Sequence, residues 1–318
     1  MRNNLVLILT TRCNFKCKHC IREYYTKQYD LSFSLIKKTL KDAKELGIKH
    51  LGLTGGEPIL YPNFDALIDL ISKFGFTWSI VTNGSMYKKY DYSIDRHKSN
   101  LKFIAISLDG GTEETHDFMR QKGSYKDVIK AVNYYLKKKI FVRLAMTASA
   151  KNIKDIPKFI ELGVKLNVNA LKIGGTIATG YNKDLQLTWA QKTSIYEYIK
   201  KLKKSDLKVH IDYGTSLYTF TDENHFCANV DDHEPTINAS GEYIYCCDTV
   251  GQGAVLGNIK NEDFSDLYIK GIKKATWLKN ERRKLILKKK FFKDFNSCNY
   301  CNTMLKNELH LQKKIVLK

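Results

Sequence analysis

The sequence predicts an α/β protein: an open (β/α)6 partial TIM barrel followed by a small cysteine-rich C-terminal domain. Two observations predict the barrel. Six short apolar segments, rich in β-branched and aromatic residues, recur along the chain, and amphipathic helical segments separate them. Strands that alternate with helices form a parallel sheet with right-handed crossovers, and six units are fewer than the eight that close a full barrel. A third observation, the loss of this alternation after Thr215, predicts the separate C-terminal part.

The predicted strands and helices follow one another in a regular order. The first helix, Ser32–Leu46, carries apolar residues on one face and stops at Gly47. The second, Asn63–Phe74, starts at an asparagine cap and stops at Gly75. In such barrels the functional groups lie at the carboxyl ends of the strands. The strands are expected at Leu5–Thr10, His50–Thr54, Thr77–Thr82, Lys102–Leu108, Phe141–Thr147 and Leu166–Ile173.

The chain divides into four predicted parts. The first is the barrel (1–187), and the second is a bridging helix, Trp189–Lys204, with a strand-like segment, Leu207–Tyr213 (188–214). The third is the cysteine-rich domain (215–306), and the fourth is a basic tail (307–318). No run of 18 or more apolar residues occurs, and the apolar segment Leu5–Leu9 is too short for a signal peptide. A cytoplasmic location without a membrane partner is therefore expected.

The strong positive charge says little about partners. Lysine and arginine number 53 and aspartate and glutamate 33, which gives a net charge of +20. Such a balance is compatible with a nucleic-acid partner. The lysines, however, are scattered along helix faces, and only residues 282–293 form a dense basic block. Nucleic acid is therefore a possible partner, but not the favoured one.

The eight cysteines fall into two groups, of which the first lies near the start of the chain. Cys13, Cys17 and Cys20 form a C-x3-C-x2-C pattern after the first predicted strand. Sets of thiolates in a reducing compartment select zinc or iron–sulfur clusters. A zinc site would need a fourth ligand such as the neighbouring His19. Three cysteines on a cubane leave one iron open to a substrate or cofactor, which favours an iron–sulfur cluster.

This cysteine pattern resembles the cluster loop of the radical S-adenosylmethionine (SAM) enzymes. Thr54-Gly55-Gly56-Glu57-Pro58, at the end of the second predicted strand, resembles the GGEP motif of the same family. The resemblance implies a [4Fe–4S] cluster on the three cysteines. It also implies a SAM molecule bound by Gly55, Gly56, Glu57 and Pro58, with the Glu57 carboxylate on the methionine ammonium group. His19 departs from the family, which usually has a bulky aromatic residue before the third cysteine.

Two further strand ends are similar to those of the family. Val81-Thr82-Asn83-Gly84 ends the third predicted strand, and Ile106-Ser107-Leu108-Asp109-Gly110 ends the fourth. The resemblance makes Asn83 a SAM-site residue and places Ser107 and Asp109 near the SAM ribose. For Asp109, an ordinary turn cap is the alternative explanation.

The second cysteine group consists of Cys227, Cys246, Cys247, Cys298 and Cys301, of which all but Cys247 fit a ligand pattern. The spacing Cys-x13-Gly-x4-Cys and the later C-x2-C pair resemble the SPASM and Twitch extensions of radical SAM enzymes. Because no cysteine follows Cys301, the resemblance implies the shorter Twitch form over residues 215–306, with one auxiliary [4Fe–4S] cluster. A hairpin turn at residues 238–242 is expected to bring Cys227 and Cys246 close together. A zinc site on the same four cysteines is the alternative.

Cys247 is one thiol more than the auxiliary cluster needs. On a strand, its side chain and that of Cys246 would point to opposite faces, so the two are not expected at the same cluster corner. A buried structural cysteine is one explanation. The other comes from the resemblance: the Cys-Cys pair is similar to that of radical SAM peptide epimerases, in which the second cysteine is the hydrogen-atom donor.

The resemblance implies that a 5′-deoxyadenosyl radical, made from SAM, abstracts hydrogen from a substrate carbon. The implied cofactors are SAM and two [4Fe–4S] clusters, and the implied electron donor is an external protein of the flavodoxin or ferredoxin type. Members with this extension often modify ribosomally made peptides, which favours a peptide substrate with Cα epimerisation or a crosslink as the outcome. The alternatives are dehydrogenation of a sugar or aminoglycoside alcohol, modification of a nucleic-acid base, and a non-catalytic iron–sulfur or zinc binding module.

Overall fold

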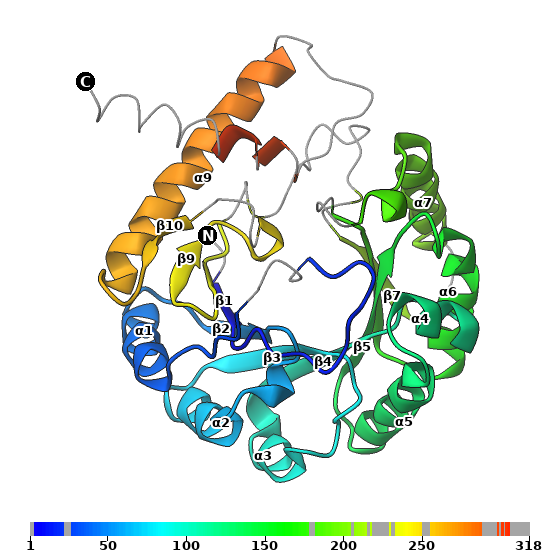
Figure 1. Ribbon diagram of the computed structural model, residues 1–318, viewed down its shortest axis with the longest axis horizontal. Helices are drawn as coiled ribbons and strands as arrows, with labels where there is room; N and C mark the ends of the chain where they lie inside the picture. The colour runs from blue at the N-terminus through cyan, green and yellow to red at the C-terminus, as the bar shows by residue number, and fades with distance from the viewer. Residues whose placement is uncertain are drawn as a thin grey trace.

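Seven parallel strands form the barrel, and they lie side by side in chain order. The computed structural model describes residues 3–21, 27–177, 182–204, 207–214, 217, 229, 233–249, 255–287, 298, 300–301 and 303–305. Each of the strands β1 to β7 pairs in parallel with the next (Figure 1). Their bounds are Asn4–Ile8, His50–Thr54, Thr77–Thr82, Leu101–Ser107, Val142–Ala148, Ala170–Gly175 and His210–Tyr213. Among the strands of the described residues, β7 stands at one end of the sheet, so the barrel is open on that side.

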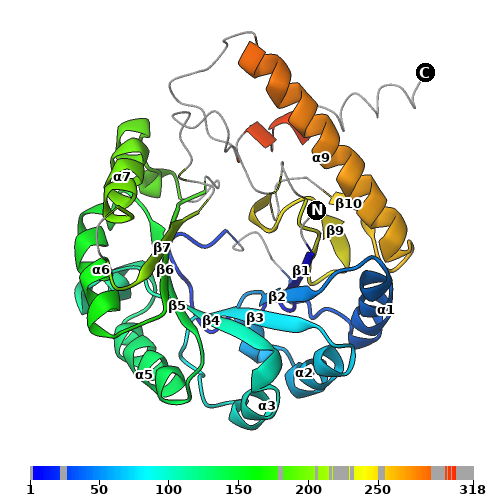
Figure 2. The ribbon, with the colours of Figure 1, turned by 180° about the vertical axis from the view of Figure 1, so that it is seen from behind.

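Helices cover the outer side of this curved sheet, as the two opposite views in Figures 1 and 2 show. On β2, Leu51 and Leu53 are fully buried, whereas the residues that alternate with them are partly exposed. Across the described residues, no helix combines the length and the apolar character that spanning a bilayer requires. Helices α1 to α7 comprise Phe33–Glu45, Phe64–Lys73, Asp91–Arg96, Glu113–Met119, Ser124–Lys137, Ile156–Lys165 and Trp189–Leu202.

Three short strands from the cysteine-rich part extend the sheet beyond β1. β8 (Thr236–Ile237) pairs in parallel with β1, β9 (Glu242–Ile244) pairs antiparallel with β8, and β10 (Val255–Asn258) pairs antiparallel with β9. The β8–β9 hairpin turns at Gly241, whose φ of 86° is in the left-handed region that favours glycine. The long helix α9 (Phe264–Leu287) then packs against α1 and β10. The division of the chain into four parts stays a prediction.

The predicted partial barrel is confirmed, but its sixth strand was placed wrongly at the start. The sequence analysis expected Leu166–Ile173, whereas α6 runs to Lys165 and β6 begins only at Ala170. The Leu166 amide still donates to a carbonyl of α6, and Asn167 has a positive φ of 55°. The apolar residues of this short stretch therefore belong to a helix end and a turn, which apolar spacing alone does not distinguish from a strand.

Candidate active site

A cavity of about 410 Å³ opens at the carboxyl ends of the parallel strands. One wall is the loop after β1, and the others are the ends of the neighbouring strands. Glu57, Pro58 and Asp109 are not among the lining residues. The structure thus brings together all three cysteines of the loop and only part of the predicted SAM site. The predicted residues that line the cavity are Cys13, Cys17, Cys20, Gly55, Gly56, Asn83 and Ser107.

The cysteine loop rests directly on the Gly55-Gly56 turn. The Gly56 amide donates to the Thr10 carbonyl at 2.7 Å, and the Glu57 amide donates to the Arg12 carbonyl at 2.8 Å. A Cβ added to Gly55 would lie 2.7 Å from the Thr10 oxygen, and one added to Gly56 would lie 2.3 Å from the Arg12 oxygen. The glycines are therefore required by a close backbone contact, which fixes the start of the cysteine loop.

Glu57 lies behind this turn and ties the end of β2 to the end of β3. The residue is 1% exposed. Its Oε1 accepts a hydrogen bond from the Thr82 hydroxyl at 2.7 Å, and its Oε2 accepts one from the Asn83 amide at 2.8 Å. Burial raises the pKa of Glu57 to about 7, although these hydrogen bonds act in the opposite direction. Pro58 is also buried. Contacts of Glu57 and Pro58 with SAM stay predictions.

Asn83 and Ser107 present polar groups at the cavity wall. The Asn83 side-chain amide donates to Asn14 Oδ1 at 2.8 Å, which links the end of β3 to the cysteine loop. Ser107 is the last residue of β4 and is 9% exposed. Both residues reach the cavity on which the cysteines open, so their assignment to the SAM site is compatible with the geometry.

Asp109 is buried and paired with other groups of the protein. The residue is 0% exposed. Its Oδ1 accepts a hydrogen bond from the Thr147 amide at 2.8 Å, and its Oδ2 lies 2.6 Å from His19 Nε2 and 2.5 Å from Arg120 Nε. Burial by itself would raise the pKa of Asp109, but Arg120 and His19 outweigh it and hold that pKa well below its usual range. Both oxygens already have partners and neither lines the cavity, so a contact of Asp109 with the SAM ribose stays a prediction.

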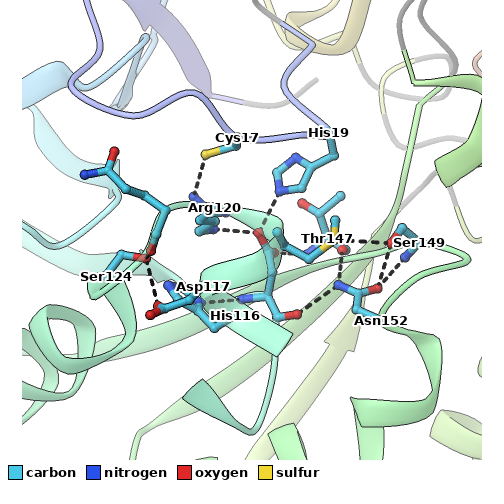
Figure 3. Close-up of polar contacts among 12 residues, drawn as sticks. Cys17, His19, His116, Asp117, Arg120, Ser124, Thr147, Ser149 and Asn152 are labelled. Carbon is cyan, nitrogen blue, oxygen red and sulfur yellow. Dashed lines mark hydrogen bonds and ion pairs between the residues drawn. The ribbon is translucent and has the colours of Figure 1, made fainter. Parts of the chain in front are cut away.

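Arg120 and His19 meet at Asp109 beside the cysteine loop (Figure 3). Arg120 follows α4, its side chain is 9% exposed, and its Nη1 lies 3.8 Å from Cys17 Sγ as a hydrogen-bond donor. In the sequence, His19 stands out only as a departure from the family, and no motif marks Arg120. A single arginine after a short helix carries no local signal, since its partners lie far away in the sequence.

The three cysteines of the loop are a donor set that fits an iron–sulfur cluster. Burial raises the pKa of Cys17 to about 12 and also raises that of Cys13, so both are neutral thiols without metal. Metal binding removes such protons. His19, the fourth zinc ligand considered above, is bound to Asp109 through Nε2. Three thiols on one cavity, with space beside them for a further ligand, match a cluster with one open iron.

Two cations that no sequence motif singles out also line the cavity. Arg143 of β5 and Lys172 of β6 line it together with Phe103 of β4, and Arg143 Cζ lies 4.1 Å from the centre of the Phe103 ring. Two residues further along β4 and β5, the lining residues are Ala105 and Ala145. A closed barrel fills its interior with bulky branched side chains, whereas these alanines leave this interior open.

Cys246, Cys247 and Asp248 lie together at the turn after β9. Strand β9 ends at Ile244, and Cys247–Thr249 is a single turn of 3-10 helix. The two sulfurs and a carboxylate oxygen of Asp248 all lie within 4.8 Å of one another. The expectation that the two cysteines point to opposite faces is therefore wrong, because side chains in a 3-10 turn do not alternate as they do on a strand. Asp248 also lines the cavity, and Cys247 Sγ lies 3.7 Å from its Oδ1.

The C-terminal C-x2-C pair packs in part against the same turn. Cys298 and Cys301 are buried, with exposed fractions of 8% and 5%. Cys301 belongs to an apolar cluster with Leu278 of α9, and Cys246 packs against that cluster. Cys227, the remaining predicted ligand of the auxiliary cluster, lies outside the described residues. Cys246 and Cys301, from distant parts of the chain, thus pack at the same apolar cluster.

Comparison with known proteins shows what the barrel region resembles. Residues 7–163 match the model of the radical SAM superfamily. The antilisterial bacteriocin subtilosin biosynthesis protein AlbA of Bacillus subtilis is 32% identical over 163 residues, which are 49% of this chain and 36% of AlbA. GTP 3′,8-cyclase of Campylobacter jejuni is 32% identical over 159 residues, which are 48% of this chain and 49% of the cyclase. The matched region is thus half or less of these relatives.

Solved structures match over more of the chain. Streptococcus suis SuiB bound to S-adenosylmethionine superposes with a TM-score of 0.72 at 17% identity, over 84% of this chain and 65% of SuiB. The protein anSMEcpe with bound AdoMet superposes with a TM-score of 0.68 at 17% identity, over 85% of this chain and 82% of anSMEcpe. At such low identity, the likeness concerns the fold.

Proposed function

We propose, from the match of residues 7–163 to the radical SAM superfamily, that this chain is a radical SAM enzyme that abstracts a hydrogen atom from a carbon of a peptide substrate. A cluster on Cys13, Cys17 and Cys20, with SAM bound beside it, supplies the 5′-deoxyadenosyl radical in this proposal. The observation that carries it is the shared cavity, onto which the three thiols and the Gly55-Gly56 turn both open.

In this proposal the chain's own residues position SAM and keep water from the radical. Polar groups at three neighbouring strand ends line the cavity and can form hydrogen bonds with SAM. They belong to the Gly55-Gly56 backbone, Asn83 and Ser107. The cavity lies inside the barrel, where closure over a bound substrate excludes solvent. The electron comes from an external donor of the flavodoxin or ferredoxin type.

A peptide substrate is supported by the names of several relatives. AlbA takes part in the biosynthesis of the bacteriocin subtilosin. SuiB has been solved with its precursor peptide SuiA, and anSMEcpe with the peptide Kp18Cys. The cyclase named above acts on GTP, so GTP should be tested beside peptides as an alternative substrate.

The auxiliary cluster of this proposal is held by Cys227, Cys246, Cys298 and Cys301. Its support is the convergence of Cys246 and Cys301 on one apolar cluster. Anaerobically reconstituted protein should contain about eight irons per chain, as two cubanes require. The Cys13/Cys17/Cys20 triple alanine variant should keep about half of them. Stoichiometric zinc in place of the second cluster contradicts this part.

Cys247 is proposed as the hydrogen-atom donor that makes the reaction an epimerisation. Its support is the position of its sulfur, 3.7 Å from a carboxylate oxygen of Asp248, which lines the cavity. In deuterated water the wild-type product should gain one solvent deuterium at the altered carbon. Cys247→Ala should keep substrate hydrogen abstraction and lose this return. A product that has lost two hydrogens points instead to a crosslink or a dehydrogenation.

The experiment that tests the class is SAM cleavage. Reconstituted protein with dithionite should form 5′-deoxyadenosine, and the triple alanine variant should form none. Arg283→Ala, at an exposed position of α9, is a matched control for handling and should keep the wild-type rate. Equal rates in the triple variant and the wild type show that the cysteine assignment is wrong.

A further inference from the structure

Arg120 links the ion pair at Asp109 to a sulfur of the cysteine loop (Figure 3). We propose that Arg120 is a positioning residue that sets the reduction potential of the cluster on Cys13, Cys17 and Cys20 through its hydrogen bond to the Cys17 sulfur. The inference rests on the proposed function, because it requires that these cysteines hold a cluster.

The guanidinium is held in place by a network that surrounds Asp109. Arg120 Nε lies 2.5 Å from Asp109 Oδ2, which leaves Nη1 facing Cys17 Sγ at 3.8 Å. Asp109 is fixed in turn by the Thr147 amide on its Oδ1 and by Asn152, whose side-chain amide donates to the Asp109 carbonyl at 2.9 Å. Arg120 therefore cannot swing away from the sulfur without giving up a buried ion pair.

The loop is docked on the barrel by contacts that do not involve Arg120. The Lys18 amide donates to the Met119 carbonyl at 3.0 Å, and His19 Nε2 lies 2.6 Å from Asp109 Oδ2. Both contacts fall in the loop between the cysteines. Other contacts therefore already hold the loop on the barrel, and the hydrogen bond from Arg120 to the Cys17 sulfur is additional to them. We therefore expect this bond to act on the properties of the sulfur.

The charge of Arg120 favours the reduced form of such a cluster. One-electron reduction adds one negative charge, which is shared by iron and sulfur, and the electron comes from dithionite in the experiment below. An N–H donor at a cysteine sulfur raises the reduction potential, because the bond strengthens as the sulfur becomes more negative. The Asp109 carboxylate partly offsets the cation. Arg120, however, is the group that donates directly to the Cys17 sulfur.

The test is a potentiometric titration of reconstituted protein followed by electron paramagnetic resonance. The signal of the loop cluster is the one that the Cys13/Cys17/Cys20 triple alanine variant lacks. Arg120→Met should shift its midpoint potential to more negative values. Arg120→Lys keeps the charge, but a lysine ammonium lacks the planar guanidinium that contacts Asp109 and Cys17 at the same time. The shift of the midpoint potential in this variant should therefore be smaller than in Arg120→Met. Arg120→Lys also provides a second variant if Arg120→Met fails to fold.

Arg143→Met is the matched control. Arg143 is a second arginine on the same cavity, but its guanidinium lies over Phe103, so the variant should keep the wild-type potential. If the Arg120 variants hold less cluster but titrate at the wild-type potential, Arg120 only docks the loop and the proposal is overturned. Absence of any loop-cluster signal in the wild type would instead defeat the proposed function, so the two failures are distinguishable.

Discussion

Gly56→Ala is expected to displace the cysteine loop, because the new methyl group has no room. Its Cβ would lie 2.3 Å from the Arg12 oxygen and 2.8 Å from the Thr11 oxygen, and both atoms belong to the backbone. Relief requires a movement that breaks the hydrogen bonds from the Gly56 amide to Thr10 and from the Glu57 amide to Arg12. Two such bonds contribute about 1–3 kcal/mol, and overpacking costs about 1–3 kcal/mol more.

Alanine also stabilises by about 0.4–1 kcal/mol through the unfolded state, so a net loss of about 2–5 kcal/mol in the free energy of unfolding is expected. Urea unfolding of the iron-free protein measures it, and iron content after reconstitution should fall as well. Gly52→Ala, on the strand β2 that precedes this turn, is the matched control, since its Cβ would meet only Val6 Cγ2 at 3.5 Å, an ordinary contact. Equal midpoints and equal iron in the two variants would refute the reasoning.

Two further predictions concern the buried carboxylates. The pKa of Glu57 is raised from 4.5 to about 7, so its contribution to stability is present below pH 4.5 and is lost as the pH rises to 7. Glu57→Gln has no carboxyl group to titrate. Between pH 4.5 and pH 7, the free energy of unfolding of this variant should therefore rise relative to that of the wild type by on the order of 3 kcal/mol. A difference that is constant with pH contradicts this. The pKa of Asp109 is lowered from 3.8, so its contribution is present above pH 3.8 and is lost as the pH falls further. Asp109→Asn should therefore cost about 3–5 kcal/mol at pH 7, because it leaves Arg120 without its buried partner, and the cost should shrink in acid. Urea unfolding at pH 7 and pH 3 checks this, and an equal cost at both would count against it.

Local patterns predicted the parts of the molecule that depend on local chemistry. The alternation of strands and helices predicted the open parallel barrel, since each strand buries one face against the helix that follows it. The cysteine loop and the Gly55-Gly56 turn were recognised because each is a short motif, and the structure places both on the same cavity. Leu166 and Val168 were misassigned because an apolar residue near a helix end looks the same as one in a strand.

Long-range contacts explain what the sequence did not reveal. A carboxylate at the end of a strand can face the cavity or lie behind it, and spacing does not distinguish the two. For Asp109 the choice is made by His19 and Arg120, which reach it from the cysteine loop and from the end of α4. The Cys246–Cys247 pair was misjudged for a similar reason, because the strand before it ends at Ile244 and the alternation of side chains stops there.

The two carboxylates behind the cavity differ in a way that bears on the cluster. Glu57 has hydrogen-bond donors that are uncharged groups, Thr82 and backbone amides, and its pKa rises to about 7. Asp109 has a guanidinium partner and remains ionised. The carboxylate that stays negatively charged, Asp109, is thus paired with a cation, and the other carboxylate, Glu57, can take up a proton. A cluster on the loop cysteines would thus gain its electron beside one carboxylate that a cation compensates and another that can be protonated.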